Sequence, residues 1–341
     1  SERPRETGRL RRFLAAALRK MKLNPRTARV KAFAKINLGL KVLYQRPDGY
    51  HELRTIYQTI SLADKIELVY TPGRRRVIKV ECTPEIPDNL AGRAAELIMD
   101  FLDVRGELTI RIDKRIPLGA GLGGGSTDAA AVLMSLPPMT GSYINMEQLL
   151  ILAARLGSDV PLFMIGGTVL GIGRGSEVYP LPEPHRAHGL LVVPPSVQIS
   201  TAEAYRRLGR SLTNASACNM ISVFQSCVWR VDGGVSAPSW PAQIGNDFEQ
   251  VIYSQHPRPR AIRNKLQRLG AAFAMLTGSG AGVYGIFEAR PSARRAAEEF
   301  PKEQVFPFVF VSRKSYRAHW LRRLWPYAVE DVWPPLSQVF R

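Results

Sequence analysis

The chain has 341 residues, of which 45% are hydrophobic and 22% are charged. This composition is typical of a globular protein with room for about two domains. The three cysteines, Cys82, Cys218 and Cys227, lack C-x-x-C spacing and are odd in number, so we expect no disulfide framework, no zinc site and a reducing compartment such as the cytoplasm. The longest apolar stretch, residues 271–287, is interrupted by TGSGAG, which argues against a membrane-spanning helix.

The net charge of +18 is concentrated at the two ends of the chain. Residues 1–30 hold ten lysines and arginines against two acids, and residues 312–341 hold six against two. We interpret residues 1–30 as a solvated, partly helical basic arm, and an arginine-rich leader for plastid import remains an alternative. The body between the arms is mildly basic, which suits phosphorylated ligands, and we expect neither a nucleic-acid nor a membrane partner.

The first predicted element is a strand over residues 30–44, VKAFAKINLGLKVLY. Apolar residues alternate with polar ones at period two, which is typical of a half-buried strand. The predicted buried face consists of Val30, Ala32, Ala34, Ile36, Leu38, Leu40, Val42 and Tyr44. The opposite, polar face consists of Lys31, Lys35, Asn37, Gly39 and Lys41.

Turn and helix signals follow this strand. The PDG sequence at 47–49 predicts a tight turn that presents Tyr50 and His51 at its exit. Apolar residues at helical spacing after PDN predict a helix over 90–102. LTIRI predicts a strand over 108–112. MEQLLILAARLG predicts a helix that ends at Gly157.

Residues 117–133, PLGAGLGGGSTDAAAVL, form a glycine loop followed by a helix-forming run. Three interpretations are open. Gly119, Gly121 and Gly124 fit the dinucleotide motif G-x-G-x-x-G, although the acid that this motif requires falls inside a predicted helix. The loop also fits the start of a Walker A motif, but Gly125 occupies the lysine position. It could instead be a turn that only packs a helix. If the loop binds an anion through backbone N–H groups and the start of the helix, its lysine must come from elsewhere in the chain.

The segment SDVPLFMIGG places Asp159 shortly before Pro161, a residue favoured in a first helical turn. A helix N-cap is therefore an alternative to a catalytic role for Asp159. The proline-rich PLPEPH at 180–185 predicts a domain junction. His185 and His188 have no third ligand nearby in the sequence, so we expect no metal site there.

Four segments of the sequence resemble the GHMP small-molecule kinases, the family of galactose, homoserine and mevalonate kinases, and they occur in the same order as in that family. They are AKINLGLKVLYQRPDGYHEL, DKRIPLGAGLGGGSTDAA, LGSDVPLFMIGGTVLGIGRGSEVYPL and LTGSGAGVYGIF. They span most of residues 31–290, whereas residues 211–245 match no pattern. The resemblance implies an α+β fold of two domains with the active site in the cleft between them. The implied division is a basic arm (1–30), an N-terminal ATP-binding domain (31–182), a C-terminal domain (183–311) and a basic extension (312–341).

The resemblance also implies roles for individual residues. Asp159 would be the catalytic base that accepts the proton of the attacking hydroxyl, and Lys35 would be the cation beside it. ATP would be bound by Asn89 near the adenine, by Lys114, and by the loop residues Pro117, Leu118, Gly119, Ala120, Gly121, Leu122, Gly123, Gly124, Gly125, Ser126 and Thr127. Mg²⁺ would accompany ATP; Ser126 is a candidate ligand, and no acidic cluster is dedicated to the metal.

The segment RPDGYHEL points to one branch of the family, which acts on a cytidine diphosphate-linked methylerythritol in the non-mevalonate isoprenoid pathway. Tyr50 and Tyr205 would sandwich the cytosine, His51 would bind the edge of the base, and Asn37 would face the 2-hydroxyl that receives the phosphoryl group. Two alternatives remain open: a family member for another small alcohol, such as homoserine or a mevalonate derivative, and a nucleic-acid-binding protein. The sequence does not indicate an oligomeric state.

Overall fold

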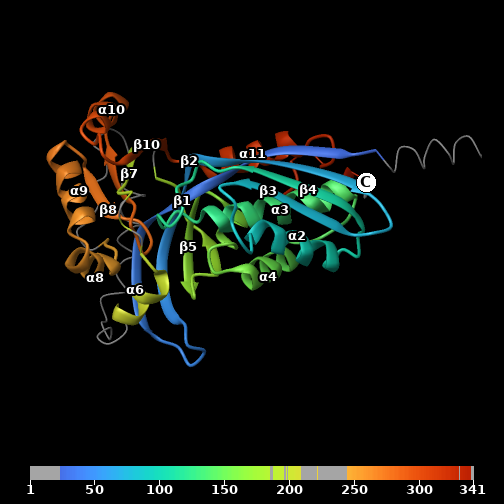
Figure 1. Cartoon of the computed structure of the whole chain (residues 1–341), viewed down its shortest axis with the longest axis horizontal. Helices are drawn as coiled ribbons and strands as arrows, with labels where there is room; N and C mark the ends of the chain where they lie inside the picture. The colour runs from blue at the N-terminus through green and yellow to red at the C-terminus, as the bar shows by residue number, and fades with distance from the viewer. Residues whose placement is uncertain are drawn as a thin grey trace, which may run out of the picture.

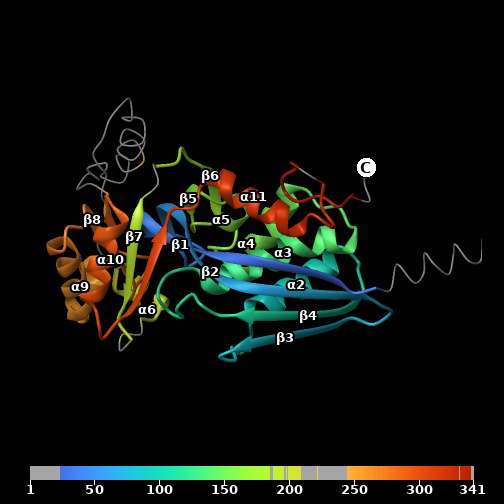
Figure 2. The same ribbon diagram turned by 90° about the horizontal axis from the view of Figure 1, so that it is seen from above.

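The computed structural model describes residues 24–184, 187–195, 197, 199–208, 221, 244–329 and 331–338. These residues form an α+β fold with two β-sheets, which confirms the predicted fold class (Figure 1). The larger sheet and its helices make up most of the body, and the smaller sheet lies at one end (Figures 1 and 2). None of the described helices is long and apolar enough to cross a membrane.

The larger sheet has the strand order β3-β4-β2-β5-β6, with β1 paired to β2 outside this path. Its strands are β1 (Arg26–Gln45), β2 (His51–Pro72), β3 (Val77–Thr83), β4 (Gly106–Asp113), β5 (Thr168–Gly173) and β6 (Glu177–Pro180). The strands β1 and β2 form one long antiparallel hairpin, whose predicted turn is closed by a hydrogen bond from the Gly49 N–H to the Arg46 carbonyl. The turn end of this hairpin extends towards the smaller sheet and packs against it.

Helices cover one face of the larger sheet (Figure 2). They are α2 (Leu90–Phe101), α3 (Gly124–Thr140), α4 (Met146–Leu156) and the short α5 (Leu162–Ile165). The predicted helices over 90–102 and up to Gly157 are confirmed, and α3 begins directly in the glycine loop. A capping box from Asn145 and Gln148 explains where α4 starts.

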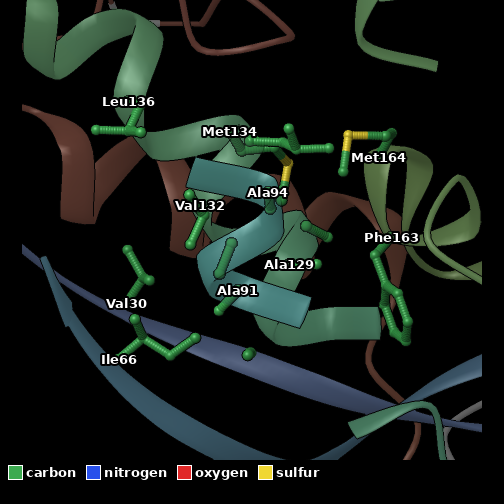
Figure 3. Close-up of a cluster of buried hydrophobic side chains, with 14 of the residues drawn as sticks. Val30, Ile66, Ala91, Ala94, Ala129, Val132, Met134, Leu136, Phe163 and Met164 are labelled. Carbon is green, nitrogen blue, oxygen red and sulfur yellow. The ribbon is translucent and has the colours of Figure 1, made fainter. Parts of the chain in front are cut away.

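Small side chains allow α2 and α3 to pack closely against each other and against the sheet. Ala91 and Ala94 of α2 and Ala129 of α3 are completely buried beside Val30 of β1 and Ile66 of β2 (Figure 3). Because alanine adds little volume, two helices can approach the same sheet without leaving gaps. This core fixes the position of α3 and therefore the position of the glycine loop at its start.

The smaller sheet is entirely antiparallel and has the order β10-β7-β9-β8. Its strands are β7 (His188–Val193), β8 (Phe273–Leu276), β9 (Val283–Phe287) and β10 (Gln304–Val309). The helices in this part of the chain are α6 (Thr201–Leu208), α8 (Phe248–Gln255), α9 (Pro257–Arg268) and α10 (Arg290–Glu298). The strands of the two sheets thus come from separate parts of the chain on either side of the PLPEPH segment, of which His185 lies outside the described residues.

The first strand differs from the predicted half-buried pattern. It begins at Arg26, and both of its faces are buried through its middle, including Lys35 and Asn37. Tyr44, which we placed on the buried face, is 55% exposed. Three register shifts in the pairing with β2 interrupt the alternation of side chains. The face that we expected to be solvated is covered by the glycine loop at Lys35 and by the segment after β8 at Asn37.

The helix α11 (Arg313–Leu324), which we assigned to a separate C-terminal extension, packs against the larger sheet's helices. It is capped by Ser312, and its buried side chains Tyr316, Trp320 and Leu324 belong to the same core as α2 and α3. The Tyr316 hydroxyl donates a hydrogen bond to the Phe163 carbonyl over 2.6 Å. The amino-acid sequence after the second sheet therefore contributes to the first core, and the proposed domain boundary near residue 182 stays a prediction.

His319 connects α11 to the first strand. Its ring lies edge-on to Phe33 with 5.2 Å between centroids, and its Nε2 accepts a hydrogen bond from the Lys31 backbone N–H over 3.2 Å. Burial, together with the positive charges of Arg323, Lys31 and Arg322, lowers the pKa of His319 to about 4. The folded protein thus favours the neutral imidazole.

This shift predicts a specific pH dependence of stability. The contribution of neutral His319 is complete above its ordinary pKa of 6.5 and is lost as the pH falls from there towards about 4. We expect His319→Gln, which retains a hydrogen-bond acceptor, to reduce the pH dependence, so that wild type loses about 1–2 kcal/mol more than the variant between pH 7 and pH 4.5. Urea unfolding at several pH values measures this difference, and parallel curves for the two proteins would contradict it.

Candidate active site

A cleft of about 900 Å³ lies between the two sheets, a size typical of small-molecule sites. Its lining comes from the β1–β2 hairpin, the glycine loop, the turn at Ser158 and Asp159, the helix α6, and the segment between β8 and β9. Among the described residues that line it, the cations are Lys35, Arg174 and Arg206, whereas Asp159 is the only carboxylate. The cleft therefore suits an anionic ligand and has a single acidic group to act as a base.

The glycine loop enters the cleft at the N-terminus of α3. Gly119, Gly121 and Gly123 adopt left-handed φ angles of 66°, 75° and 68°, which strongly favour glycine. A Cβ atom on Gly121 would lie 2.3 Å from the Thr277 carbonyl oxygen, whereas a Cβ on Gly125 would meet no atom within 4 Å. The loop thus packs against the second domain on one side and leaves space on the other, where the N-terminal N–H groups of α3 can receive an anion.

Lys35 comes from the middle of β1 and supplies the cation that the glycine loop lacks. Its backbone N–H donates to the Leu122 carbonyl over 3.1 Å, and a Cβ on Gly123 would lie 3.3 Å from the Lys35 Cγ. The lysine side chain therefore passes directly along the loop. Its Nζ lies 3.4 Å from Asp159 Oδ2 and donates to Asn37 Oδ1 over 2.8 Å.

The side chain of Asp159 is 31% exposed, whereas that of Lys35 is only 4% exposed. The alternative N-cap role for Asp159 is not what the structure shows, because Pro161 occupies the N-cap position of α5 and that cap has no side-chain hydrogen bond. The carboxylate is instead held by Lys35 and by the Tyr57 hydroxyl. A carboxylate held in this way at the side of a cleft can accept a proton from a bound alcohol.

Asn37 lies beside Lys35 and Asp159 and forms hydrogen bonds to both domains. Its Oδ1 accepts from the Gly278 backbone N–H over 2.9 Å, and its Nδ2 donates to the Thr55 hydroxyl over 2.7 Å. Its own N–H donates to Thr277 Oγ1, and its carbonyl accepts from the Tyr284 hydroxyl. Asn37 lines the cleft, and these contacts make it also a structural link to the second glycine segment.

The predicted pyrimidine pocket lies in the cleft where the turn end of the β1–β2 hairpin meets α6. Tyr50 is 52% exposed, and the Arg174 guanidinium lies 4.6 Å from the centre of its ring. His51 stacks on Tyr205 with 5.0 Å between centroids, and Tyr205 rests edge-on against Phe248. The structure brings all three predicted aromatic residues into one cleft, although the observed stack is His51 on Tyr205.

The His51 Nε2 atom is buried and has no hydrogen-bond partner within the described structure. Burial also lowers the pKa of His51. A neutral imidazole with an unused polar atom in a cleft is well suited to bind a polar ligand group, because an unpaired buried polar atom is otherwise costly.

Three residues predicted to bind ATP do not line the cleft. Asn89 caps α2 by accepting a hydrogen bond from the Ala91 N–H over 3.0 Å. Thr127 is buried within α3. Lys114 is enclosed by two carboxylates, as described next, so its contact with a phosphate stays a prediction.

Lys114 forms a buried ion cluster behind the start of α3. Its Nζ contacts Asp64 and lies 2.9 Å from Asp128 Oδ2. Asp64 also accepts hydrogen bonds from the backbone N–H groups of Arg115 and Ile116. Burial, partly offset by Lys114, raises the pKa of Asp128 to about 8. This cluster holds the segment before the glycine loop against β2.

Sequence reasoning missed Tyr57, Arg174 and Arg206. Tyr57 appears in the sequence as an ordinary apolar strand residue, and only strand pairing reveals its position, because it lies opposite Asn37 on β2. Counting outwards from the PDG turn would have placed the two residues near each other. Arg174 follows β5 and lies within one of the four resembling segments, but we assigned it no role, and Arg206 on α6 lies in none of them. Only the folded chain brings both arginines to the cleft.

Removal of the Asp64 carboxylate tests the role of the ion cluster. We expect Asp64→Ala to destabilise the protein by about 3 kcal/mol or more, because it leaves the buried Lys114 short of a partner and two backbone N–H groups unpaired. Asp113→Ala is the control, because its pairs with Lys65 and Arg115 are exposed and are worth at most about 1 kcal/mol. Denaturant unfolding of both variants measures the difference, and equal losses would show that the cluster is not structurally special.

Comparison with known families finds two matches within the chain. The model of the GHMP kinases N terminal domain matches residues 89–167, and the model of the GHMP kinases C terminal domain matches residues 239–305. The first match contains the glycine loop and Asp159, and the second contains the glycine segment that contacts Asn37.

Curated relatives extend this similarity over almost the whole chain. A protein of Solibacter usitatus named 4-diphosphocytidyl-2-C-methyl-D-erythritol kinase is 47% identical over 317 residues, which cover 92% of this chain and 98% of the relative. A protein of the same name from Geobacter sulfurreducens is 39% identical, with 79% of this chain and 93% of the relative covered.

Solved structures show the same relationship. A crystal structure of 4-(cytidine 5'-diphospho)-2C-methyl-D-erythritol kinase matches with a TM-score of 0.68 and 31% identity, covering 83% of this chain and 98% of the other. A homoserine kinase from Cytophaga hutchinsonii matches with a TM-score of 0.64 but only 16% identity, covering 84% of this chain and 95% of the other. The second match is evidence of a shared fold alone.

Proposed function

This chain belongs to the GHMP kinase family, and we propose that it transfers a phosphoryl group from ATP to the 2-hydroxyl of 4-diphosphocytidyl-2-C-methyl-D-erythritol. The observation that carries the proposal is the pair of Lys35 and Asp159 beside the N-terminus of α3, in a cleft that also contains Tyr50, His51 and Tyr205. The relatives that bear this enzyme's name support the choice of substrate.

In the proposed reaction, the glycine loop and the N-terminal N–H groups of α3 bind the phosphates of ATP. The oxygen of the substrate hydroxyl bonds to the γ-phosphorus of ATP, and the bond from that phosphorus to ADP breaks. Asp159 accepts the proton that the hydroxyl loses. Lys35 offsets the negative charge that the transferred group brings next to Asp159. Phosphoryl transfer depends chiefly on positioning and charge stabilisation, which these residues are placed to provide.

The donor atoms in the cleft fit a Mg²⁺ ion that arrives with the nucleotide. No cluster of three or more histidine, cysteine or acidic side chains exists among the described residues, and Asp159 is the only carboxylate in the described lining of the cleft. Phosphate oxygens would therefore be the main ligands, with the Ser126 hydroxyl as a candidate protein ligand. When bound, Mg²⁺ would neutralise part of the phosphate charge.

The part of the cleft formed by the hairpin turn and α6 is suited to a cytidine diphosphate. Tyr50 and Tyr205 offer aromatic faces for the base, His51 offers an unpaired ring nitrogen, and Arg174 and Arg206 offer positive charge for a diphosphate. A homoserine or mevalonate type of substrate contains no pyrimidine and would not need this arrangement. A panel of alcohols supplied with ATP and Mg²⁺ tests the proposal directly, and preference for an alcohol without cytidine would reject it.

We expect Asp159→Asn to lower kcat by about 10²- to 10⁴-fold, because the amide cannot accept the hydroxyl proton. Binding of ATP should change little, since the loop and the start of α3 are unaltered. Steady-state kinetics and nucleotide titration measure the two effects. Activity above about a tenth of the wild-type value would show that Asp159 is not the base.

We expect Tyr50→Ala to raise KM for the cytidyl substrate by roughly 5- to 150-fold, the effect of losing one base–aromatic stack of about 1–3 kcal/mol. KM for ATP should stay nearly constant because Tyr50 belongs to the turn between β1 and β2 and not to the glycine loop that is proposed to bind ATP. Tyr44→Ala is a matched control, since Tyr44 is an equally exposed tyrosine of the same hairpin that does not line the cleft. Equal KM values for the two variants would contradict a pyrimidine pocket at Tyr50.

A further inference from the structure

Tyr57 is a buried tyrosine whose hydroxyl reaches the proposed base. It lies on β2, is 2% exposed, and donates a hydrogen bond from its hydroxyl to Asp159 Oδ1 over 3.1 Å. The Lys35 Nζ lies 5.3 Å from the centre of the Tyr57 ring. Asp159 is therefore contacted on one oxygen by Lys35 and on the other by Tyr57.

Two glycines make the space that this phenol occupies. A Cβ atom on Gly171 of β5 would lie 2.6 Å from the Tyr57 Cε2, and a Cβ on Gly175 would lie 2.6 Å from the Tyr57 hydroxyl oxygen. Real side chains do not tolerate such distances, so any larger residue at these positions would displace the ring. The hydroxyl also lies 3.5 Å from the Gly175 carbonyl, a long contact, so Asp159 is its principal acceptor.

Among the residues that the structure describes, the charged and titratable groups that face Asp159 come from three elements: Lys35 on β1, Tyr57 on β2 and Tyr205 on α6. Burial, reinforced by the negative charge of Asp159, raises the pKa of Tyr57 and that of Tyr205 well above the usual range of tyrosine. Tyr57 thus keeps its proton at any pH at which a kinase works. Its hydroxyl can only donate to the ionised carboxylate, and such a bond favours the ionised form.

We infer that Tyr57 is a positioning residue for phosphoryl transfer, which orients the Asp159 carboxylate by donating a hydrogen bond to it, without touching the reacting atoms. The inference rests on the proposed function, because it requires Asp159 to be the base. With Lys35 on Oδ2 and Tyr57 on Oδ1, rotation of the carboxylate about its Cβ–Cγ bond breaks one contact or both. The carboxylate therefore presents a fixed edge to the cleft, as a base must do to meet a bound hydroxyl.

The test is Tyr57→Phe, which removes the hydroxyl and keeps the ring. We expect kcat to fall by about 10- to 100-fold, the size expected for one hydrogen bond to a charged group. The acid limb of the pH profile of kcat/KM should move to higher pH, while KM for ATP and for the cytidyl substrate stays within about twofold. The control is Tyr70→Phe, because Tyr70 is a buried tyrosine on the same strand whose hydroxyl donates to the Arg105 carbonyl. Tyr70→Phe should keep the wild-type profile.

A second variant moves the ring and keeps the hydroxyl. Gly171→Ala should push the Tyr57 ring away from Asp159, and we expect it to reproduce the shift of the acid limb. Thermal unfolding of each variant identifies any loss that comes from misfolding. Unchanged kcat and an unchanged acid limb in folded Tyr57→Phe would overturn the inference, and so would a rise in substrate KM alone, which would make Tyr57 a substrate contact.

Comparison in an Asp159→Asn background separates this inference from the proposed function. If Tyr57 acts through Asp159, Tyr57→Phe should cost little further activity once the carboxylate is gone. A full additional loss in that background would contradict the inference. If Asp159→Asn alone remains active, Asp159 is not the base and the positioning role of Tyr57 fails with it, whereas the proposed function itself fails only if the wild type does not prefer the cytidyl alcohol. If Asp159→Asn is inactive and Tyr57→Phe is normal, only the positioning role of Tyr57 fails.

Discussion

The site depends on one buried ammonium group, that of Lys35. A charge removed from water costs several kcal/mol unless it is paired and hydrogen-bonded. Lys35 satisfies this requirement through Asn37 Oδ1 and Asp159 Oδ2, and the Tyr57 ring lies nearby. These groups come from β1, β2 and the turn before α5, so the three elements have to meet around the ammonium. The requirement to pair one cation therefore also assembles the proposed catalytic group.

The strand β1, which carries Lys35, also connects the two domains. Through its amide and backbone, Asn37 bonds to Thr277, Gly278 and Tyr284, all of which belong to the second domain. Close to this point, Gly121 of the glycine loop packs against the Thr277 carbonyl. The glycine loop and the second domain are thus positioned against a common strand. The two sides of the cleft are held together where β1 and the glycine loop directly contact the segment at residues 277–278. The glycines allow this close approach of backbone to backbone.

Much of this arrangement could be predicted from the sequence, and the failures have physical causes. The glycine loop, the PDG turn and the helix before Gly157 depend on local backbone preferences, which short segments of sequence express directly. The burial of Lys35 depends on its contacts with the distant glycine loop, and the exposure of Tyr44 follows a register shift in the hairpin; no local pattern encodes either. Tyr57 was missed for the same reason, because its role exists only through pairing across the hairpin.

The two lysines near the glycine loop, Lys114 and Lys35, have different surroundings and therefore different roles. Lys114 is enclosed by the buried carboxyl groups of Asp64 and Asp128, and burial raises the pKa of Asp128. The Lys114 ammonium group is therefore paired inside the protein. Within the described part of the chain, Lys35 has a single carboxylate partner, and that partner is open to the cleft. The two lysines therefore differ: Lys114 holds the segment before the loop in place, and Lys35 is the one available for the charge stabilisation that we propose.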